Sequence, residues 1–258
     1  MLFLISPAKS LDYETPAHVT KASTPQFIAQ STELIEVLKT RSVAEIGRLM
    51  DLSESLAGLN AARYAAWSPR FTARNSKPAV LAFNGDVYDG LDAKTLDEDD
   101  LAWAQQHLVI LSGLHGVLRP LDKLQPYRLE MGTALATARG RNLYEFWGDT
   151  IAEHLNTRLA ADASPVIVNL ASQEYFRAAD RRVLKARVVE CVFEDWKNGR
   201  YKVISFFAKR ARGLMARHVI RQRIATPKRL ESFAADGYAF DAGASAPERL
   251  VFRRRLTG

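Results

Sequence analysis

The sequence predicts a single mixed α/β domain with a partly antiparallel sheet and surrounding helices, and three observations support this. Short apolar runs typical of buried strands alternate with segments whose apolar residues recur at helical spacing. The dipeptide Asn198-Gly199 lies between two apolar runs, which indicates an antiparallel hairpin. The 258 residues show no internal repeat or low-complexity linker, and their 47% hydrophobic and 25% charged content is typical of a globular domain.

The first half of the chain alternates between the two patterns. Residues 1–6 (MLFLIS) form a buried-strand pattern that Pro7 closes. The segment at 98–107 begins with acidic residues, which stabilise a helix N-terminus. We expect strands at 1–6, 79–84 and 107–113, and helices at 31–40, 43–50, 53–66 and 98–107.

The second half continues the alternation and ends with a basic helix. Apolar residues at helical spacing predict one long amphipathic helix over 143–160, and PVIVNLAS predicts a strand over 165–172. The predicted hairpin joins strands at 187–195 and 200–208. The basic helix follows directly and covers 205–223.

Charge is distributed unevenly along the chain. The formal net charge is +7, yet residues 196–230 carry eleven bases and no acid, so the rest of the chain sums to about −4 (7 − 11). Residues 86–100 hold seven acids against Lys94. Such polarity attracts an anionic partner, unless the two segments fold against each other and cancel. Both accounts stay open at this point.

Within the basic helix, a rotation of about 100° per residue places cations on both edges of an apolar stripe. One edge carries Arg210, Arg217 and Arg221, and the other carries Lys209, Arg212 and Arg223. Gly213 lies inside this helix at a cost in helix propensity, which suggests a close approach by a neighbouring helix or by a phosphate backbone.

Polar, turn-rich loops follow several predicted strands. In open α/β sheets ligands bind at the carboxyl ends of strands, so these loops predict a phosphate or carboxylate pocket. Its candidate residues are Lys9, Arg119, Arg128, Asn169 and Ser172. We expect the three cations among them to converge on one concave surface. The alternative is that glycine and proline only shape the turns, with Arg128 and Glu130 forming a structural pair.

The sequence contains no recognised catalytic or metal-binding motif. It lacks the glycine-rich nucleotide loops and the Gly-x-Ser-x-Gly motif, and its five histidines are scattered without metal-type pairing. We therefore predict no metal, no cofactor and no assigned catalytic residue. The lone Cys191 lies in an alternating apolar run and is interpreted as a small core residue.

The composition also predicts a cytoplasmic protein without a membrane segment. No apolar run approaches the ~20 residues of a membrane span, and the N-terminal stretch lacks the basic region of a signal peptide. A single cysteine excludes an internal disulfide framework.

Residues 42–67 predict two short helices that meet near Asp51. Asp51 and Glu54 have capping-box spacing for the second helix. This is compatible with a helix-hairpin-helix, whose turn offers N–H groups to a DNA phosphate, with Arg63 and Arg70 adding charge nearby. The glycine-containing hairpin is replaced by Leu-Ser-Glu, so two ordinary packed helices remain an alternative.

Seven blocks, spread in register over nearly the whole chain, resemble one protein family. They are ISPAKSLDY (5–13), DLSESLAGLNAARYAAW (51–67), FNGDVYDGL (83–91), LSGLHGVLRPLDKLQPYRLEMG (111–132), LYEFWGD (143–149), VNLASQEYF (168–176) and KVISFFAKRARGLMAR (202–217). Together they resemble the YaaA-type peroxide stress resistance proteins. The resemblance implies a cytosolic bacterial protein that limits oxidative damage and is linked to control of free intracellular iron. It further implies a single α/β domain of unusual topology, a helix-hairpin-helix element and a basic cleft that binds DNA, with no catalytic residues to carry over.

The resemblance and the charge pattern together predict binding to double-stranded or structurally distorted DNA. Clustered lysine and arginine neutralise phosphates, and phosphate contacts position a protein without reading bases. The predicted DNA-binding residues are Lys209, Arg210, Arg212, Arg217, Arg221, Arg223 and Arg63. The alternative is an enzyme that acts on a nucleotide or another phosphate-bearing small molecule at the strand-end loops. An iron-binding protein is a third possibility, which the scattered ligands support poorly. The sequence leaves the oligomeric state open.

Overall fold

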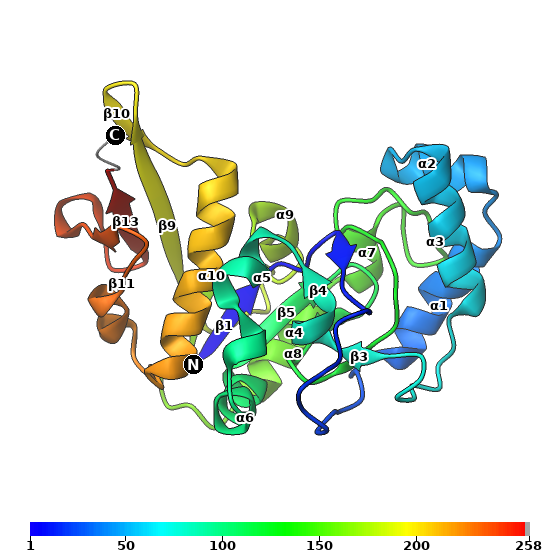
Figure 1. The fold of residues 1–258 in the computed structure, drawn as a ribbon, viewed down its shortest axis with the longest axis horizontal. Helices are drawn as coiled ribbons and strands as arrows, with labels where there is room; N and C mark the ends of the chain where they lie inside the picture. The colour runs from blue at the N-terminus through cyan, green and yellow to red at the C-terminus, as the bar shows by residue number, and fades with distance from the viewer. Residues whose placement is uncertain (256–258) are drawn as a thin grey trace.

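The computed structural model describes residues 1–255 and shows a mixed α/β fold around one large sheet (Figure 1). Nine strands form this sheet, in the order β11-β12-β13-β9-β8-β1-β5-β6, with β10 paired to β9 outside this path. The strands are β1 (Leu2–Ile5), β5 (Leu108–Ser112), β6 (Gly116–Leu118), β8 (Val166–Leu170), β9 (Arg187–Lys197), β10 (Arg200–Lys202), β11 (Ala234–Ala235), β12 (Tyr238–Phe240) and β13 (Arg249–Arg254). The five central strands from β13 to β5 are parallel, while β6, β10, β11 and β12 are antiparallel to their neighbours. The predicted mixed sheet is therefore confirmed.

The middle of the sheet is built from β1. All four of its residues are buried, as an apolar run flanked by strands on both sides requires. Phe3 pairs with Leu108 of β5 on one side and with Val168 of β8 on the other. The chain leaves β1 towards β5 and leaves β8 towards β9, so the two connections diverge from neighbouring strand ends. Such a divergence is a topological switch point, where the carboxyl ends of the strands leave a crevice.

Helices and two small sheets cover the central sheet. The α-helices are α1 (Ile28–Lys39), α2 (Val43–Met50), α3 (Glu54–Ala66), α4 (Ala79–Ala82), α5 (Asp86–Leu91), α6 (Glu98–His107), α7 (Leu143–Trp147), α8 (Thr150–Arg158), α9 (Gln173–Phe176) and α10 (Ser205–Arg221). The small sheets pair β2 (Ser10–Leu11) with β4 (Phe83–Asn84) and β3 (Lys77–Pro78) with β7 (Lys123–Leu124). Figure 1 shows α10 lying beside α5 near β9 and β1, whereas α1, α2 and α3 gather at the opposite end of the molecule.

Most of the predicted elements are present with boundary shifts of a few residues. The strands expected at 1–6, 107–113 and 165–172 correspond to β1, β5 and β8, and the helices at 43–50 and 98–107 to α2 and α6. The Asn198-Gly199 hairpin joins β9 to β10, with both residues at positive φ. Its second strand ends at Lys202, because α10 already begins at Ser205.

Two predicted elements were wrong. The strand expected at 79–84 is the short helix α4 followed by two residues of β4. Residues 79–82 are all buried, so the sequence offered no polar positions that distinguish a buried strand from a buried helix turn. The helix expected at 143–160 is divided into α7 and α8 at Gly148, whose φ of +48° ends the first helix.

The junction between α2 and α3 also differs in detail from the prediction. Ser53, rather than Asp51, caps α3, and its hydroxyl accepts the Leu56 N–H at 3.4 Å. Asp51 adopts the left-handed conformation at the end of α2. The predicted capping box of Asp51 and Glu54 is therefore absent, while the helix-hairpin-helix remains a prediction.

Candidate functional site

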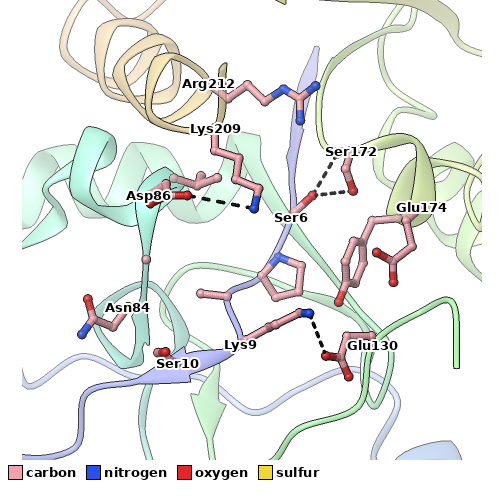
Figure 2. Close-up of a pocket in the computed structure, with 15 residues that line it drawn as sticks. Ser6, Lys9, Ser10, Asn84, Asp86, Glu130, Ser172, Glu174, Lys209 and Arg212 are labelled. Atoms are coloured by element: carbon pink, nitrogen blue, oxygen red, sulfur yellow. Dashed lines mark hydrogen bonds and ion pairs between the residues drawn. The ribbon is translucent and has the colours of Figure 1, made fainter. Parts of the chain in front are cut away.

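A cavity of about 280 Å³ opens at the carboxyl ends of β1 and β8 (Figure 2). It lies at the switch point of the sheet. Its walls come from residues 6–10 after β1, residues 84–87 before and within α5, Glu130, the start of α9, and one face of α10. The strand-end loops and the basic helix therefore line the same cavity, although the sequence predicted them as two separate features.

Two serines connect the neighbouring strand ends inside this cavity. The Ser172 N–H donates to Ser6 Oγ at 2.9 Å, and the two hydroxyl oxygens lie 3.4 Å apart. Asn169 is buried in β8 and its side-chain oxygen accepts the Ala171 N–H at 2.9 Å, which shapes the turn before Ser172. Of the two predicted pocket residues near β8, Ser172 lines the cavity and Asn169 supports the loop behind it.

Glu130 forms ion pairs with two of the predicted cations, Lys9 and Arg128. Its Oε1 lies 3.5 Å from Lys9 Nζ and 3.0 Å from Arg128 Nη2. Lys9 lines the main cavity, whereas Arg128 lines a small neighbouring hollow that shares residues 7–9 and Glu130 with it. The structural pair of Arg128 and Glu130 that the sequence left open as an alternative is present.

Arg119 lies elsewhere, so the expected convergence of three cations was wrong. Its Nη2 lies 3.0 Å from Oδ1 of the buried Asp122 and 3.4 Å from the Thr24 carbonyl oxygen. Arg119 follows β6, which runs antiparallel to β5. The end of an antiparallel strand lies at the opposite edge of the sheet from the ends of its parallel neighbours.

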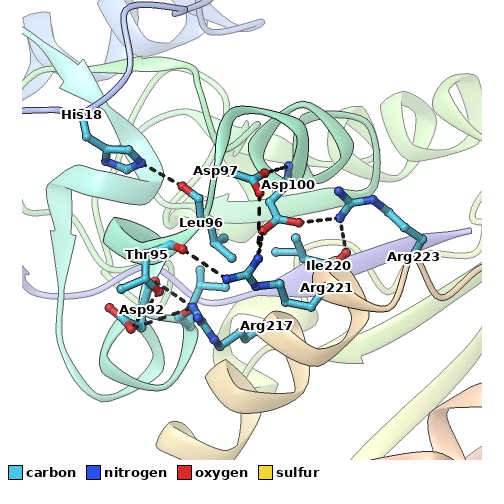
Figure 3. A network of polar contacts seen from close by, with 11 residues as sticks. His18, Asp92, Thr95, Leu96, Asp97, Asp100, Arg217, Ile220, Arg221 and Arg223 are labelled. Atoms are coloured by element: carbon cyan, nitrogen blue, oxygen red, sulfur yellow. Dashed lines mark hydrogen bonds and ion pairs between the residues drawn. The ribbon is translucent and has the colours of Figure 1, made fainter.

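The C-terminal half of the basic helix is paired with the acidic segment (Figure 3). Arg217 Nη1 donates to the carbonyl oxygens of Leu91 and Asp92, at 3.1 and 2.9 Å. Arg221 and Arg223 lie 2.9 and 2.8 Å from the two carboxylate oxygens of Asp100. The folding of these two segments against each other, which the sequence left as an alternative, is what the structure shows.

The N-terminal half of α10 keeps more of its charge available. Lys209 Nζ is 4.0 Å from Asp86, and Arg210 Nε is 3.7 Å from Asp236, so both pairs are loose. Arg212 makes no ion pair with any residue of the described chain, and its buried Nε has no hydrogen-bond partner there. Burial lowers the pKa of Arg212, and the charge of Glu190 opposes this shift without forming an ion pair with Arg212 in the described chain.

A second basic surface precedes α10 and was missed by the sequence reasoning. Within residues 1–255, Lys197, Arg200 and Lys202 of the β9–β10 hairpin lie within 4.0 Å of no carboxylate oxygen. Trp196 and Phe206 flank these bases and are 37% and 57% exposed. The sequence interpretation placed Phe206 where the predicted strand 200–208 and the basic helix overlap, left Trp196 just beyond the strand at 187–195, and gave no signal that either faces solvent.

Arg63 does not belong to either basic surface. It lies on α3, half-buried, and its Nη1 donates to Asn60 Oδ1 at 3.3 Å. Burial lowers its pKa. Figure 1 places α3 at the end of the molecule away from α10, so Arg63 cannot extend the row of cations on α10.

The thiol and the histidines form no reactive or metal-binding cluster in the described part of the chain. Cys191 is buried in β9, and burial raises the pKa of its thiol well above the usual range. Across residues 1–255, no group of three or more His, Cys, Asp or Glu side chains is arranged to hold a metal ion. Within the same residues, no helix combines the length and apolar character that crossing a membrane requires.

Comparison with known proteins gives consistent matches over the full length. The family model described as "Peroxide stress protein YaaA" matches residues 1–244. A "UPF0246 protein" of Paracidovorax citrulli is 68% identical over 259 residues and is covered completely, as is this chain. Others from Polaromonas naphthalenivorans and Leptothrix cholodnii are 69% and 64% identical over 254 residues, which is 98% of each chain compared.

Proposed function

This chain belongs to the peroxide stress protein YaaA family, and we propose that it serves the peroxide stress response by binding the phosphate backbone of DNA. Membership of the family supports the role in the stress response. The DNA contact is our proposal, and the observation that carries it is the segment 196–210, which contains no acid and whose three hairpin bases make no ion pair within residues 1–255. We call this segment the hairpin surface.

The hairpin surface combines three bases that make no ion pair in the described chain with two exposed aromatic side chains. Its five bases are Lys197, Arg200, Lys202, Lys209 and Arg210, and the segment contains no acid. The three bases of the hairpin make no ion pair within the described chain, so they can neutralise phosphates without first breaking an internal contact. Figure 1 shows the hairpin projecting beyond the rest of the sheet, next to the first turn of α10.

The arginines at the C-terminal end of α10 and just beyond it are less available for this contact. Arg217, Arg221 and Arg223 are held by residues 91–100, and DNA would have to compete with those carboxylates and carbonyl groups. A charge that already has a buried partner gains less from a phosphate, because the internal pair must be broken first. We therefore assign the main DNA contact to the hairpin surface and a smaller share to the C-terminal half of α10.

The chemistry of the hairpin surface favours distorted DNA over a perfect duplex. Aromatic side chains stack on unpaired nucleobases regardless of sequence. Trp196 and Phe206 are exposed beside the lysine and arginine side chains of the hairpin surface. Phosphate contacts give little sequence preference. Coverage of exposed bases would limit their oxidation, which links this mode of binding to peroxide stress. The link to free iron rests on the family resemblance, and no residue of the structure is assigned to it.

Fluorescence anisotropy with a labelled duplex and a labelled bubble of mixed sequence tests the proposal. For the parent protein, four to five phosphate contacts predict a log–log salt slope of about −3.5 to −4.5. The variant Lys197→Ala, Arg200→Ala, Lys202→Ala should bind at least about tenfold more weakly, with a slope shallower by about 2 to 3. Trp196→Ala should weaken binding to the bubble more than binding to the duplex.

Two further variants make the result specific to this surface. Arg141→Ala, Arg182→Ala, Lys185→Ala removes the same charge from exposed positions elsewhere and should shift affinity far less. Arg63→Ala, Arg70→Ala probes the predicted helix-hairpin-helix. If the hairpin variant binds DNA like the parent, the hairpin surface is not the DNA face. A loss confined to the Arg63 and Arg70 variant would move the contact to α3.

A further inference from the structure

We infer that the cavity between β1 and β8 binds a small metabolite that carries an anionic group, carboxylate or phosphate, together with an ammonium or similar donor group. This site shares Lys209 with the hairpin surface, but none of the three bases of the hairpin itself lines it. It would give the protein a small-molecule ligand in addition to its proposed DNA partner. The inference rests on the position of the cavity, on two buried polar atoms without partners, and on its balanced charge.

The position of the cavity is the one that a parallel sheet reserves for ligands. The chain leaves β1 and β8 in opposite directions, and the crevice between the two strand ends holds the Ser6 and Ser172 side chains. Ligands of open α/β sheets bind in this crevice. A volume of about 280 Å³ is at the lower end of small-molecule sites.

Arg212 is the residue that we assign to bind the anionic group of the ligand. This side chain enters the cavity from α10 (Figure 2), makes no ion pair in the described chain, and leaves its buried Nε without an acceptor. A guanidinium withdrawn from water is normally paired, because burying an uncompensated charge is costly. Lys209 lines the same side of the cavity and is 52% exposed, so it can turn towards an anion held by Arg212.

Glu130 is the residue that we assign to accept a hydrogen bond from the ammonium or other donor group of the ligand. One carboxylate oxygen, Oε1, already faces Lys9 and Arg128, but the other, Oε2, is buried without a partner. Glu174 lies beside it and receives the Gly132 N–H at 2.9 Å on one oxygen. An N–H or ammonium group of a ligand would satisfy the free oxygen of Glu130, since a buried acceptor without a partner costs free energy.

The balance of charge distinguishes this ligand from nucleic acid. The cavity is lined by three cations, Lys9, Lys209 and Arg212, and by three acids, Asp86, Glu130 and Glu174. A polyanion would meet repulsion from the acids, whereas a molecule with both signs matches both walls. The two hydroxyl groups of Ser6 and Ser172 lie between the walls and suit a polar middle section.

Isothermal titration calorimetry with small probes tests the inference. Phosphoethanolamine and 4-aminobutyrate carry an ammonium with a phosphate or a carboxylate, and inorganic phosphate and acetate carry the anion alone. We expect at least one of the two ammonium-bearing probes to bind, and to bind more tightly than its simple anion. Which of the two binds more tightly then distinguishes a phosphate ligand from a carboxylate ligand.

Variants at the two ends of the cavity give opposite predictions. Arg212→Gln should weaken every probe that binds by about tenfold or more, because a charge-assisted contact is lost. Glu130→Gln should weaken the ammonium-bearing probes but leave the simple anions unchanged or tighter, since it removes a repulsive carboxylate. Arg182→Gln, an exposed arginine outside the cavity, is the matched control and should change nothing.

The outcomes that would overturn the inference are equally specific. If neither ammonium-bearing probe binds to the parent protein, or if Arg212→Gln binds both as well as the parent does, the site is not what we infer. If Glu130→Gln weakens phosphate and phosphoethanolamine alike, the assignment of a donor end is wrong. Should Arg212→Gln fail to fold by circular dichroism, Lys209→Gln replaces it. None of the hairpin residues changed in the DNA test lines the cavity, so the two proposals fail independently.

Discussion

Gly90 of α5 and Gly213 of α10 face each other where the two helices cross, and neither position has room for a side chain. A Cβ atom on Gly213 would lie 1.8 Å from the Val87 carbonyl oxygen, and one on Gly90 would lie 2.1 Å from the Arg210 carbonyl oxygen. The obstacles are backbone atoms, which cannot move without separating the helices. The sequence predicted a close approach at Gly213, and the structure identifies the neighbour as a helix.

Gly213→Ala should therefore destabilise the protein although alanine is the better helix former. Separating α5 from α10 would cost about 2 to 4 kcal/mol, at or above the usual range for overpacking. The matched control is Gly58→Ala in α3, where a Cβ atom meets nothing within 4 Å. That change should stabilise by about 0.5 to 1 kcal/mol. Urea denaturation of both variants measures the difference, and equal stabilities would contradict the close packing.

Asp100→Asn should loosen the C-terminal end of α10. Asp100 is 3% exposed and lies beside both Arg221 and Arg223, so its loss leaves Arg223 without a carboxylate and Arg221 with only the looser pair to Asp97 at 4.0 Å. The Arg221 contact is an ion pair at 2.9 Å without hydrogen-bond alignment, while Arg223 donates a hydrogen bond. Both guanidinium groups are about 40% exposed, so we expect a loss of only about 1 to 2 kcal/mol.

The same variant also reports on DNA. Freed from Asp100, Arg221 and Arg223 would become available to phosphates, and affinity at low salt should rise severalfold if α10 faces the DNA along its length. The control is Asp99→Asn, one residue earlier on the same helix, which is exposed and makes no ion pair in the described chain. An equal gain in affinity for both variants would show that only net charge matters.

Two histidines predict a loss of stability in mild acid. Burial lowers the pKa of His154 to about 4 and that of His115 to about 3, against about 6.5 in an unfolded chain. Between these values the unfolded chain binds more protons than the folded one, so stability is complete above pH 6.5 and falls as the pH drops towards 4.

The size of this effect can be measured directly. The fully buried His115 should lower the free energy of unfolding by on the order of 2 kcal/mol between pH 7.5 and pH 5, and the partly exposed His154 should lower it by less, because solvent screens its charged form. Urea denaturation at pH 7.5 and pH 5.0 compares the parent with His154→Gln, which should retain only part of the pH dependence. A dependence unchanged by this substitution would show that His154 is not held neutral by the fold.

Cys191 should be inert towards peroxide in the folded protein. Its thiol is buried in β9 and its pKa is raised by burial, so little thiolate forms near neutral pH. Ellman's reagent should modify the native protein slowly and the urea-unfolded protein at once. Cys191→Ala should retain peroxide protection in cells, and a loss of protection by a folded variant would indicate a direct thiol mechanism.

Helices and strands could be predicted from the sequence where one hydrophobic pattern dominated a segment. Contacts between distant segments could not. Continuous apolar runs identified β1, β5 and β8, because strands buried on both faces of a parallel sheet lack polar positions. Periodicity alone did not separate the buried turn of α4 from a strand. The candidate cavity was predicted only in part: Lys9 and Ser172 were found, while Arg119 was misplaced because the direction of β6 cannot be read from residues 116–118.

The ion pairs of the basic helix show why contacts between distant segments could not be predicted. Residues 86–100 and 205–223 were each recognised by their charge, yet nothing in either segment indicated that Asp100 would meet Arg221 and Arg223. Such pairs depend on how α5, α6 and α10 dock, which the two glycines at the crossing decide. The unpartnered atoms of Arg212 and Glu130 likewise emerge only when distant segments are assembled.

The place of β1 in the sheet has a consequence for how the protein is made. Its four buried residues are synthesised well before both of their partners, residues 108–110 and residues 167–170. At ~5–20 residues per second, the second partner appears on the order of ten seconds or more after β1 itself. Until residues 108–110 are made this apolar strand has no neighbour, and until residues 167–170 are made it lacks the second one. The nascent chain is therefore expected to be a chaperone client, and its sheet to close only after synthesis has passed residue 170.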